Sequence, residues 1–225
     1  MTKISTRLAG QSVPDKIAYH TVRTIVTVFC RVWCRMTIDG RDNFPKDGPF
    51  ILAPTHRSII DTPVSSGVYR KRMRFMGADK WWSNKHFGKL LTALGGFPVS
   101  RGTADREALK RCIAVIEGGE PLVLFPEGER KSGPIVQPLF DGAAYVAMKT
   151  GVPIVPVGIG GSERVMPKGA KFIHPRKLYV MVGKPLTAQI ADTAKEQRAA
   201  ARQLTTELHA ELQRLFDIAQ ARAGH

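Results

Sequence analysis

The segment THRSIID places an imidazole and a carboxylate five residues apart, at His56 and Asp61. In a regular helix this spacing turns the two side chains about 140° apart, so they could meet only across a turn. Ser58, three residues before Asp61, is typical of a helix start and would leave His56 outside the helix. The carboxylate could then orient the imidazole while the other ring nitrogen removes a proton. A surface histidine beside a capping aspartate is the alternative that this segment alone leaves open.

The elements that would position these residues follow from apolar runs alternating with helical patterns. Predicted strands cover 50–56, 73–77, 96–99, 122–125, 152–159 and 177–183. Predicted helices cover 15–35, a segment from about 58, 83–94, 105–117, 140–150 and 191–221. This alternation predicts a single α/β domain with a largely parallel central sheet and functional residues at strand ends. We assign the α/β domain to 40–225, including the C-terminal helix, and an amphipathic helical segment to 1–39.

The N-terminal helix is apolar on most of its circumference. Its polar residues recur every four positions and form one stripe, at Arg23, Thr27, Arg31 and Arg35. Such a helix can lie in a membrane interface, or it can pack on the domain with its arginines outward. The C-terminal helix instead carries a leucine stripe that should pack on the domain or a partner, at Leu204, Leu208, Leu212 and Leu215.

Composition bounds the class of protein. The chain has 225 residues, of which 43% are hydrophobic and 24% charged, which argues against disorder and against a disulfide scaffold. The longest run without a charged residue, 150–162, is too short and too rich in Pro and Gly to span a bilayer. No apolar core of a secretory signal is present near the N-terminus, so we expect a cytoplasmic protein.

The net charge of +15 implies an anionic partner, which could be nucleic acid, lipid or cofactor phosphate. Basic and bulky apolar residues interleave over 70–91, which favours a membrane surface. We find no signature of a common nucleic-acid-binding fold and expect no nucleic-acid partner. The three cysteines are an odd number, and Cys30 and Cys34 have no partner at metal spacing, so we interpret them as reduced and expect no metal site.

Several catalytic motifs are absent from the sequence. It contains no G-x-S-x-G elbow, no P-loop, no H-E-x-x-H and no complete G-x-G-x-x-G motif, which argues against a serine hydrolase, an NTPase or a dehydrogenase. Gly158, Gly160 and Gly161 approach a G-x-G-x-x-G motif, but Glu163 stands where its third glycine should be.

Three further segments follow THRSIID in order: GGFPVSR at 95–101, FPEGERK at 125–131 and VPIVPV at 152–157. Together the four blocks, over roughly residues 40 to 185, resemble those of the lysophosphatidic acid acyltransferase type of glycerolipid acyltransferases, the H-x4-D family. The chain departs from the family pattern in four places: Thr55 replaces the usual Asn, Glu129 and Lys131 stand where Thr and Ser are common, and Phe97 falls one place early. None of these changes removes a catalytic group, but they bear on the identity of the acceptor.

The resemblance implies that His56 is the general base and Asp61 its orienting partner, so that a substrate hydroxyl attacks a thioester without an acyl-enzyme. It also implies an acceptor site made by Arg101, Glu127, Gly128 and Arg130. Guanidinium groups suit a phosphate monoester, and Gly128 would allow close backbone approach. We expect Glu127 to accept hydrogen bonds from an acceptor hydroxyl or to orient Arg101 or Arg130.

The implied reaction moves a fatty acyl group from acyl-CoA, or from acyl carrier protein, to lysophosphatidic acid and yields phosphatidic acid in phospholipid biosynthesis. Acyl-CoA would be a co-substrate, with no other cofactor. Glycerol 3-phosphate or another lysophospholipid are alternative acceptors. A non-catalytic basic module that binds anionic lipid or nucleic acid is the alternative of a different class. Lipid substrates place the enzyme peripherally on the cytoplasmic face of the membrane.

Overall fold

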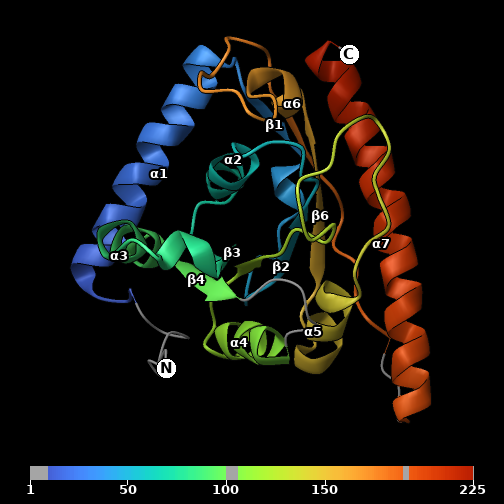
Figure 1. The fold of residues 1–225 in the computed structure, drawn as a ribbon. Coiled ribbons are helices and arrows are strands. Elements are labelled where there is room, and N and C mark those ends of the chain that lie inside the picture. The colour runs from blue at the N-terminus through green and yellow to red at the C-terminus, as the bar shows by residue number, and fades with distance from the viewer. Residues whose placement is uncertain (1–9, 100–105, 190–192, 225) are drawn as a thin grey trace.

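The computed structural model describes residues 10–99, 106–189 and 193–224. A seven-stranded sheet runs through the centre of this structure, between helices on both faces (Figure 1). The strands are β1 (Thr37–Asp39), β2 (Ile51–Pro54), β3 (Arg74–Ala78), β4 (Gly96–Val99), β5 (Leu122–Val123), β6 (Ile154–Gly160) and β7 (Tyr179–Val182). Their order is β1-β7-β6-β2-β5-β3-β4, and all neighbours are parallel except β6 and β7. The predicted α/β fold with a largely parallel sheet is confirmed.

The helices begin and end where local chemistry favours it. They are α1 (Val13–Trp33), α2 (Asp61–Val68), α3 (Lys85–Ala93), α4 (Arg106–Glu117), α5 (Gly142–Thr150), α6 (Ser162–Val165) and α7 (Ala194–Ala223), with 3₁₀ turns η1 (Arg41–Asn43) and η2 (Asp79–Trp82). Ser12 forms a capping box with Asp15 at the start of α1. Gly151 ends α5 in the left-handed conformation, with φ of 70°.

Among the described strands and α-helices, β1 and α6 were not predicted from the sequence, because a three-residue strand and a four-residue helix are too short to show a period. β1 pairs in parallel with β7, so the sheet begins before residue 40. α2 begins at Asp61 rather than near Ser58, because the residues between them form the turn over which the Asp61 carboxylate reaches back.

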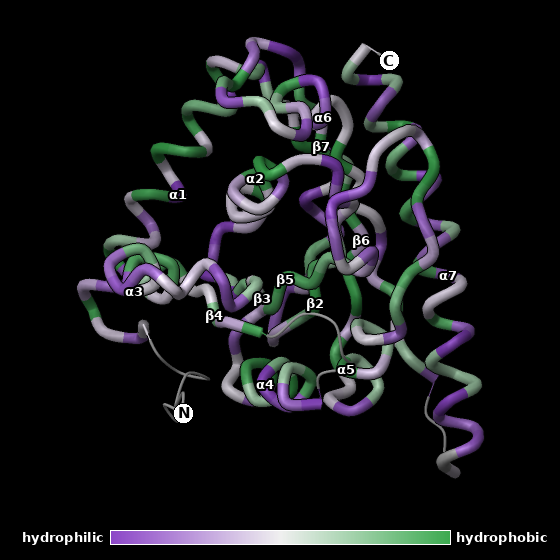
Figure 2. The backbone as a smooth tube through the Cα atoms, in the orientation of Figure 1, coloured by the Kyte–Doolittle hydropathy of each residue, from purple (hydrophilic) through white to green (hydrophobic). Residues whose placement is uncertain are grey.

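Each face of the sheet carries its own core. Ile51, Leu122 and Ile154 pack with α4, α5 and α7 on one face. Leu52, Val123 and Val155 pack with α1 and α2 on the other, because successive strand side chains point to opposite faces. The tube coloured by hydropathy shows the central strands as the most continuous apolar segments (Figure 2). The predicted leucine stripe of α7 is buried along its length, at Leu204, Leu208, Leu212 and Leu215.

Close contact between α7 and β6 explains the incomplete glycine motif. A Cβ atom built on Gly158 would lie 2.4 Å from the backbone of Leu215, and one on Gly160 would lie 2.2 Å from the backbone of Ala219. Real Cβ atoms do not approach backbone this closely. Glycine at these two positions therefore lets the helix lie directly on the strand.

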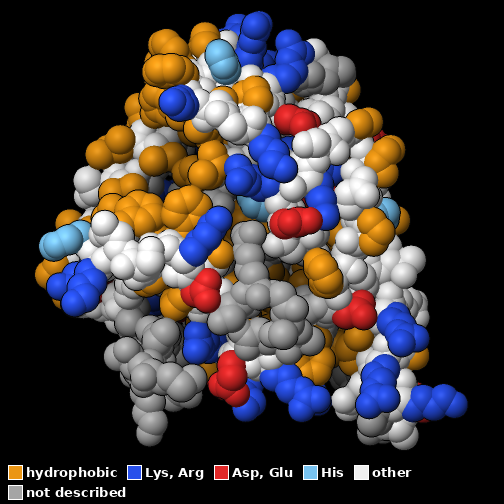
Figure 3. Space-filling view, in the orientation of Figure 1, with side chains coloured by type: hydrophobic (Ala, Val, Ile, Leu, Met, Phe, Trp, Pro, Cys, Tyr) orange, Lys and Arg blue, Asp and Glu red, His pale blue; other side chains and the backbone are white. Residues whose placement is uncertain are grey.

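The N-terminal helix packs on α2 through part of its polar stripe. Arg23 Nε donates to the backbone carbonyls of Ser66 (2.9 Å) and Tyr69 (3.1 Å) at the end of α2, where a cation is favoured by the helix dipole. The exposed large apolar residues of α1 are Val13, Ile17, Ile25, Val28, Phe29, Val32 and Trp33. The alternative in which the helix packs on the domain with its arginines outward is thus wrong for Arg23, whereas Arg31 and Arg35 are exposed to solvent. The helix presents an apolar face to its surroundings, visible along the left side of Figure 3.

The basic stretch at 70–91 divides into structural and exposed residues. Arg72 donates to the carbonyl of Ala93 at 3.0 Å, and Arg74 pairs with Glu120 at 2.7 Å; both arginines are buried. Both guanidinium groups bind groups within the domain, so they are not available to a lipid phosphate. The remaining basic residues of the stretch are exposed, at Arg70, Lys71, Lys80, Lys85 and Lys89. Within the ranges described above, no helix combines the length and apolar character needed to cross a bilayer.

All three cysteines are buried, and none forms a disulfide. The hydrogen bond between Cys30 and Cys34, together with burial, raises the pKa of Cys30, and the same hydrogen bond lowers the pKa of Cys34. Both side chains belong to the core between α1 and the sheet, as small apolar residues would.

Candidate active site

The loops that follow β2 and β5 form the site. These two strands are parallel neighbours in the sheet, so their carboxyl ends meet at one edge. The chain leaves β2 through Thr55 into His56, and it leaves β5 through Leu124 into Phe125 and Glu127. The sheet thereby joins the first and third predicted blocks, which lie about 70 residues apart in sequence.

His56 and Asp61 meet across a turn, as their spacing allows. His56 Nδ1 lies 3.2 Å from Asp61 Oδ2. The same carboxylate oxygen accepts the backbone N–H groups of Arg57 and Ser58, each at 2.6 Å. Asp61 is fully buried, while the His56 side chain is 12% exposed. The carboxylate is therefore fixed by the backbone, and it orients the ring so that Nε2 points away from Asp61.

The imidazole is also held by packing. Its ring stacks on Phe125 with centroids 4.0 Å apart and an interplanar angle of 23°. The backbone carbonyl of His56 accepts the N–H of Lys131 at 2.9 Å. Phe125 thus does more than fill the core, because it limits the orientations that the His56 ring can adopt.

Glu127 lies beneath the turn in a buried ion pair with Arg57. Arg57 Nη1 donates to both carboxylate oxygens, at 2.7 and 2.9 Å, and both side chains are almost inaccessible to solvent. Glu127 also accepts the backbone N–H of His56 at 3.2 Å and that of Gln137 at 3.1 Å. The partner of Glu127 is therefore Arg57, which sequence reasoning missed, and its carboxylate holds the backbone of the general-base candidate.

The Arg57 guanidinium also organises the loop beyond FPEGERK. Its Nε donates to the carbonyl of Gly133 at 3.1 Å and its Nη2 to that of Ile135 at 3.0 Å. Its Cζ lies 4.8 Å from the ring centroid of Phe216 on α7. One side chain therefore connects the His56 turn, the 127–137 loop and the C-terminal helix.

The other predicted acceptor residues lie nearby or outside the described ranges. Gly128 and Arg130 are exposed on the loop after β5, and Gly128 has a φ of 72°. The positive φ favours glycine there, and a Cβ on Gly128 would also lie 2.6 Å from the exposed ring of Phe140, which would have to move. Arg101 falls in 100–105, outside the described residues.

Thr55, where the family pattern has Asn, is buried and structural. Its hydroxyl accepts the N–H of Ile159 at 3.0 Å, and its own N–H donates to the carbonyl of Val157 at 3.0 Å. The Ser58 hydroxyl does not cap α2 as predicted but donates to the carbonyl of Met166 at 2.7 Å. The turn that carries His56 is thereby tied to β6 and to the chain after α6.

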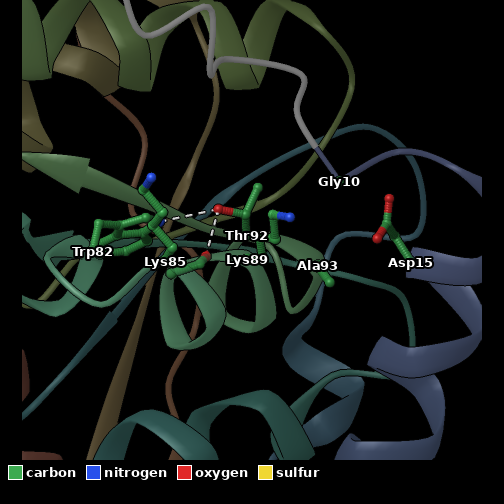
Figure 4. A pocket seen from close by; sticks show the side chains of 8 residues that line it. Gly10, Asp15, Trp82, Lys85, Lys89, Thr92 and Ala93 are labelled. Atoms are coloured by element: carbon green, nitrogen blue, oxygen red, sulfur yellow. Dashed lines mark hydrogen bonds between the residues drawn. The ribbon is translucent and has the colours of Figure 1, made fainter. Parts of the chain in front are cut away.

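Two cavities are lined by residues other than His56, Asp61 and Glu127. The larger, about 520 Å³, lies between the start of α1 and α3, with Asp15 on one side and Lys85 and Lys89 on the other (Figure 4). None of the predicted site residues within the described ranges lines it. The smaller, about 210 Å³, is mainly apolar and is lined by Tyr19, Val22, Arg23, Val26, Thr62, Pro63, Ser66, Phe75, Leu91, Leu94 and Gly96. It reaches the first turn of α2, directly after Asp61.

Among the described residues, no group of three His, Cys, Asp or Glu side chains is placed to hold a metal ion. The site defines instead an imidazole–carboxylate pair at the edge of a parallel sheet. Residues 35–160 match the family described as Acyltransferase, and the chain belongs to this family. The match contains the first three blocks and the VPIVPV strand.

Individual relatives agree with this assignment. The chain is 28% identical over 164 residues to the 1-acyl-sn-glycerol-3-phosphate acyltransferase of Bacillus subtilis, covering 72% of this chain and 79% of that protein. It is 27% identical over 210 residues to the Streptococcus pneumoniae protein of the same name, covering 89% and 74%. The crystal structure of the 1-acyl-sn-glycerophosphate (LPA) acyltransferase PlsC from Thermotoga maritima is similar in fold, with a TM-score of 0.66 and 24% identity over 90% of this chain and 84% of that one.

Proposed function

We propose that this acyltransferase transfers a fatty acyl group from acyl-CoA, or from acyl carrier protein, to the free hydroxyl of lysophosphatidic acid. The product would be phosphatidic acid. The observation that carries the proposal is the contact between His56 Nδ1 and Asp61 Oδ2, within the region that matches the acyltransferase family. The two relatives named above as 1-acyl-sn-glycerol-3-phosphate acyltransferases support this acceptor over glycerol 3-phosphate or a larger lysophospholipid.

The geometry supports direct attack. His56 Nε2 would take the proton of the acceptor hydroxyl as its oxygen forms a bond to the thioester carbonyl carbon. The carbon–sulfur bond then breaks, and the proton passes from the imidazole to the leaving thiolate, so that free CoA is released. Asp61 would hold the ring and stabilise the imidazolium formed between these two steps.

Arg101, Gly128 and Arg130 are the proposed phosphate contacts. Arg130 and Gly128 lie on the loop that Arg57 and Glu127 anchor beside His56, so a phosphate bound there would place the adjacent glycerol hydroxyl near the ring. Glu127 has its oxygens occupied by Arg57 and two backbone N–H groups. We propose that it serves the acceptor site as a positioning residue that holds this loop and the His56 backbone.

The 210 Å³ apolar cavity is the proposed site of an acyl chain. Its lining includes Thr62 and Pro63, which directly follow Asp61 in the chain, together with residues of α1, α3 and β3. An acyl chain in this cavity would have its reacting end close to the His56–Asp61 turn, and its methylenes would leave water.

Docking on anionic lipid is the proposed route to the substrates, on the cytoplasmic face of the membrane. Apolar side chains of α1 face outward, and α3 adds Phe87 and Leu90 beside exposed lysines. Basic residues with outward aromatics are typical of surfaces that lie in a membrane interface. This surface supports a peripheral enzyme rather than a nucleic-acid module.

Release of free CoA in the presence of an acceptor tests the proposal. Acyl-CoA is incubated with lysophosphatidic acid, glycerol 3-phosphate or lysophosphatidylcholine, and thiol release is followed with a thiol-reactive dye. We expect the highest kcat/KM with lysophosphatidic acid. If thiol release stayed at background with all three acceptors, a non-catalytic lipid-binding module would be favoured instead.

A further inference from the structure

We propose that the segment 166–173, together with the C-terminal end of α1, forms a second lipid-docking surface that contacts anionic bilayers next to the His56 turn. We call this segment the 166–173 loop. It was not among the membrane-contacting segments predicted from the sequence, which were the helix at 15–35 and the stretch at 70–91. The inference rests on the proposed function only in that its acceptor resides in a bilayer.

The loop is closed at its base and attached on two sides. The N–H of His174 donates to the carbonyl of Val165 at 2.8 Å, which brings the two ends of the loop together. The Ser58 hydroxyl donates to the carbonyl of Met166 at 2.7 Å, and Trp33 Nε1 donates to the carbonyl of Ile173 at 3.0 Å. The loop is thus fixed both to the turn that carries His56 and to the end of α1.

The tip of the surface is apolar. Phe172 is 76% exposed in the loop, and Val32 is 75% exposed near the end of α1. Trp33 stacks on Phe29 with ring centroids 6.3 Å apart, and both rings remain partly exposed. Figure 1 shows the loop beside the end of α1, at the top of the molecule. Large side chains held in this way expose apolar area to water that a bilayer interface would cover.

The rim of the surface is strongly basic. No Asp or Glu occurs between Arg164 and Ala191, or between Lys16 and Ile38. Four basic side chains of the loop and the chain just after it are exposed, at Lys168, Lys171, Arg176 and Lys177. Arg31 of α1 and Arg35, two residues after its end, are also exposed. In Figure 3 blue side chains gather at this end of the molecule beside apolar ones. Exposed aromatics within a basic rim match an anionic lipid surface better than an acidic protein, which would meet the charges but leave Phe172 and Val32 in water.

Co-sedimentation with vesicles tests the loop in the full-length protein. The variants are Phe172→Ser and the double variant Lys168→Glu/Lys171→Glu. The matched control is Lys195→Glu/Arg198→Glu, two exposed residues near the start of α7 and far from the loop in Figure 1. Both charge variants change the net charge by 4 × (−1), from +15 to +11.

We expect each loop variant to bind vesicles of equimolar phosphatidylglycerol and phosphatidylcholine about tenfold or more weakly than wild type. The control should bind within about threefold of wild type. CoA release with a short-chain, water-soluble acceptor should be unchanged in all variants, because none of these residues contacts the site. High salt should weaken wild-type binding.

Loop variants that sediment like wild type would overturn the proposal, as would a control that weakens equally, since net charge alone would then explain binding. Loss of binding to an acidic acyl carrier protein with unchanged vesicle binding would assign the surface to that protein and also overturn it. A wild-type protein that releases no CoA but needs the loop for vesicle binding would refute the proposed activity while supporting the docking surface.

Discussion

Removing one partner of the buried Arg57–Glu127 pair should destabilise the fold more than removing one partner of an exposed ion pair. The Arg57 side chain donates five hydrogen bonds, two to Glu127 and one each to the carbonyls of His56, Gly133 and Ile135. Arg57→Met keeps the unbranched stem of the side chain but removes the guanidinium, whose Cζ lies over the ring of Phe216, and it leaves the buried Glu127 carboxylate without its cation. Breaking a buried pair in this way costs about 3–5 kcal/mol.

The reverse change, Glu127→Gln, keeps the shape but presents an amide to donors that need an acceptor. We expect a loss of about 2–5 kcal/mol. The double variant leaves neither charge buried without its partner. Its loss in free energy of unfolding should therefore be smaller than the sum of the two single losses by at least about 1–3 kcal/mol. Urea unfolding followed by tryptophan fluorescence measures each free energy of unfolding, provided that the m-value stays constant.

The adjacent pair Lys131–Glu129 supplies the control. Its atoms are 2.8 Å apart, but its side chains are 30% and 62% exposed. The cycle of Lys131→Met and Glu129→Gln should give a coupling energy below about 1 kcal/mol. Additive losses for the buried cycle, within about 0.5 kcal/mol, would refute the argument that this pair organises the site. CoA release separates stability from positioning: below the unfolding transition, kcat should fall in both single variants of the buried pair, because the His56 backbone loses its support.

Three further predictions concern the site and the fold. His56→Ala and Asp61→Asn should keep the cooperative unfolding transition and lose about 10²–10⁴-fold in CoA release; retention of half the rate by His56→Ala would rule out the base. Arg101→Ala and Arg130→Ala should weaken binding of the phosphorylated acceptor by about 2–5 kcal/mol and so raise its KM, whereas the dependence of the rate on acyl-CoA should change less. Arg101→Lys should not restore it fully, and unchanged acceptor saturation in both alanine variants would remove the phosphate pocket. Gly160→Ala should lower the free energy of unfolding by about 1–3 kcal/mol, because the new Cβ would lie 2.2 Å from the backbone of Ala219. A Cβ on Gly119 would have nothing within 4 Å, but Gly119 has a positive φ. Gly119→Ala should therefore lose stability through backbone strain alone and leave the α7 contact intact.

Local patterns in the sequence determined the class of fold and the central pair of the site. Alternating strand and helix signals predicted a parallel sheet, and the leucine stripe predicted the buried face of α7, because hydrophobic periodicity depends only on neighbours along the chain. The spacing of His56 and Asp61 allowed contact only across a turn, and the structure places them 3.2 Å apart across one. Their catalytic role remains a proposal that the family match supports.

Only the tertiary structure decided which distant residues support that pair. Arg57 and Glu127 are 70 residues apart, and nothing in either segment indicates the other. Their contact exists because β2 and β5 are neighbours in the sheet. The same holds for Arg23, whose place in a polar stripe suggested exposure, but which points toward the carbonyl groups at the end of α2. Periodicity reports which side of a helix is polar, whereas the packing of the whole chain decides whether that side meets water or another element.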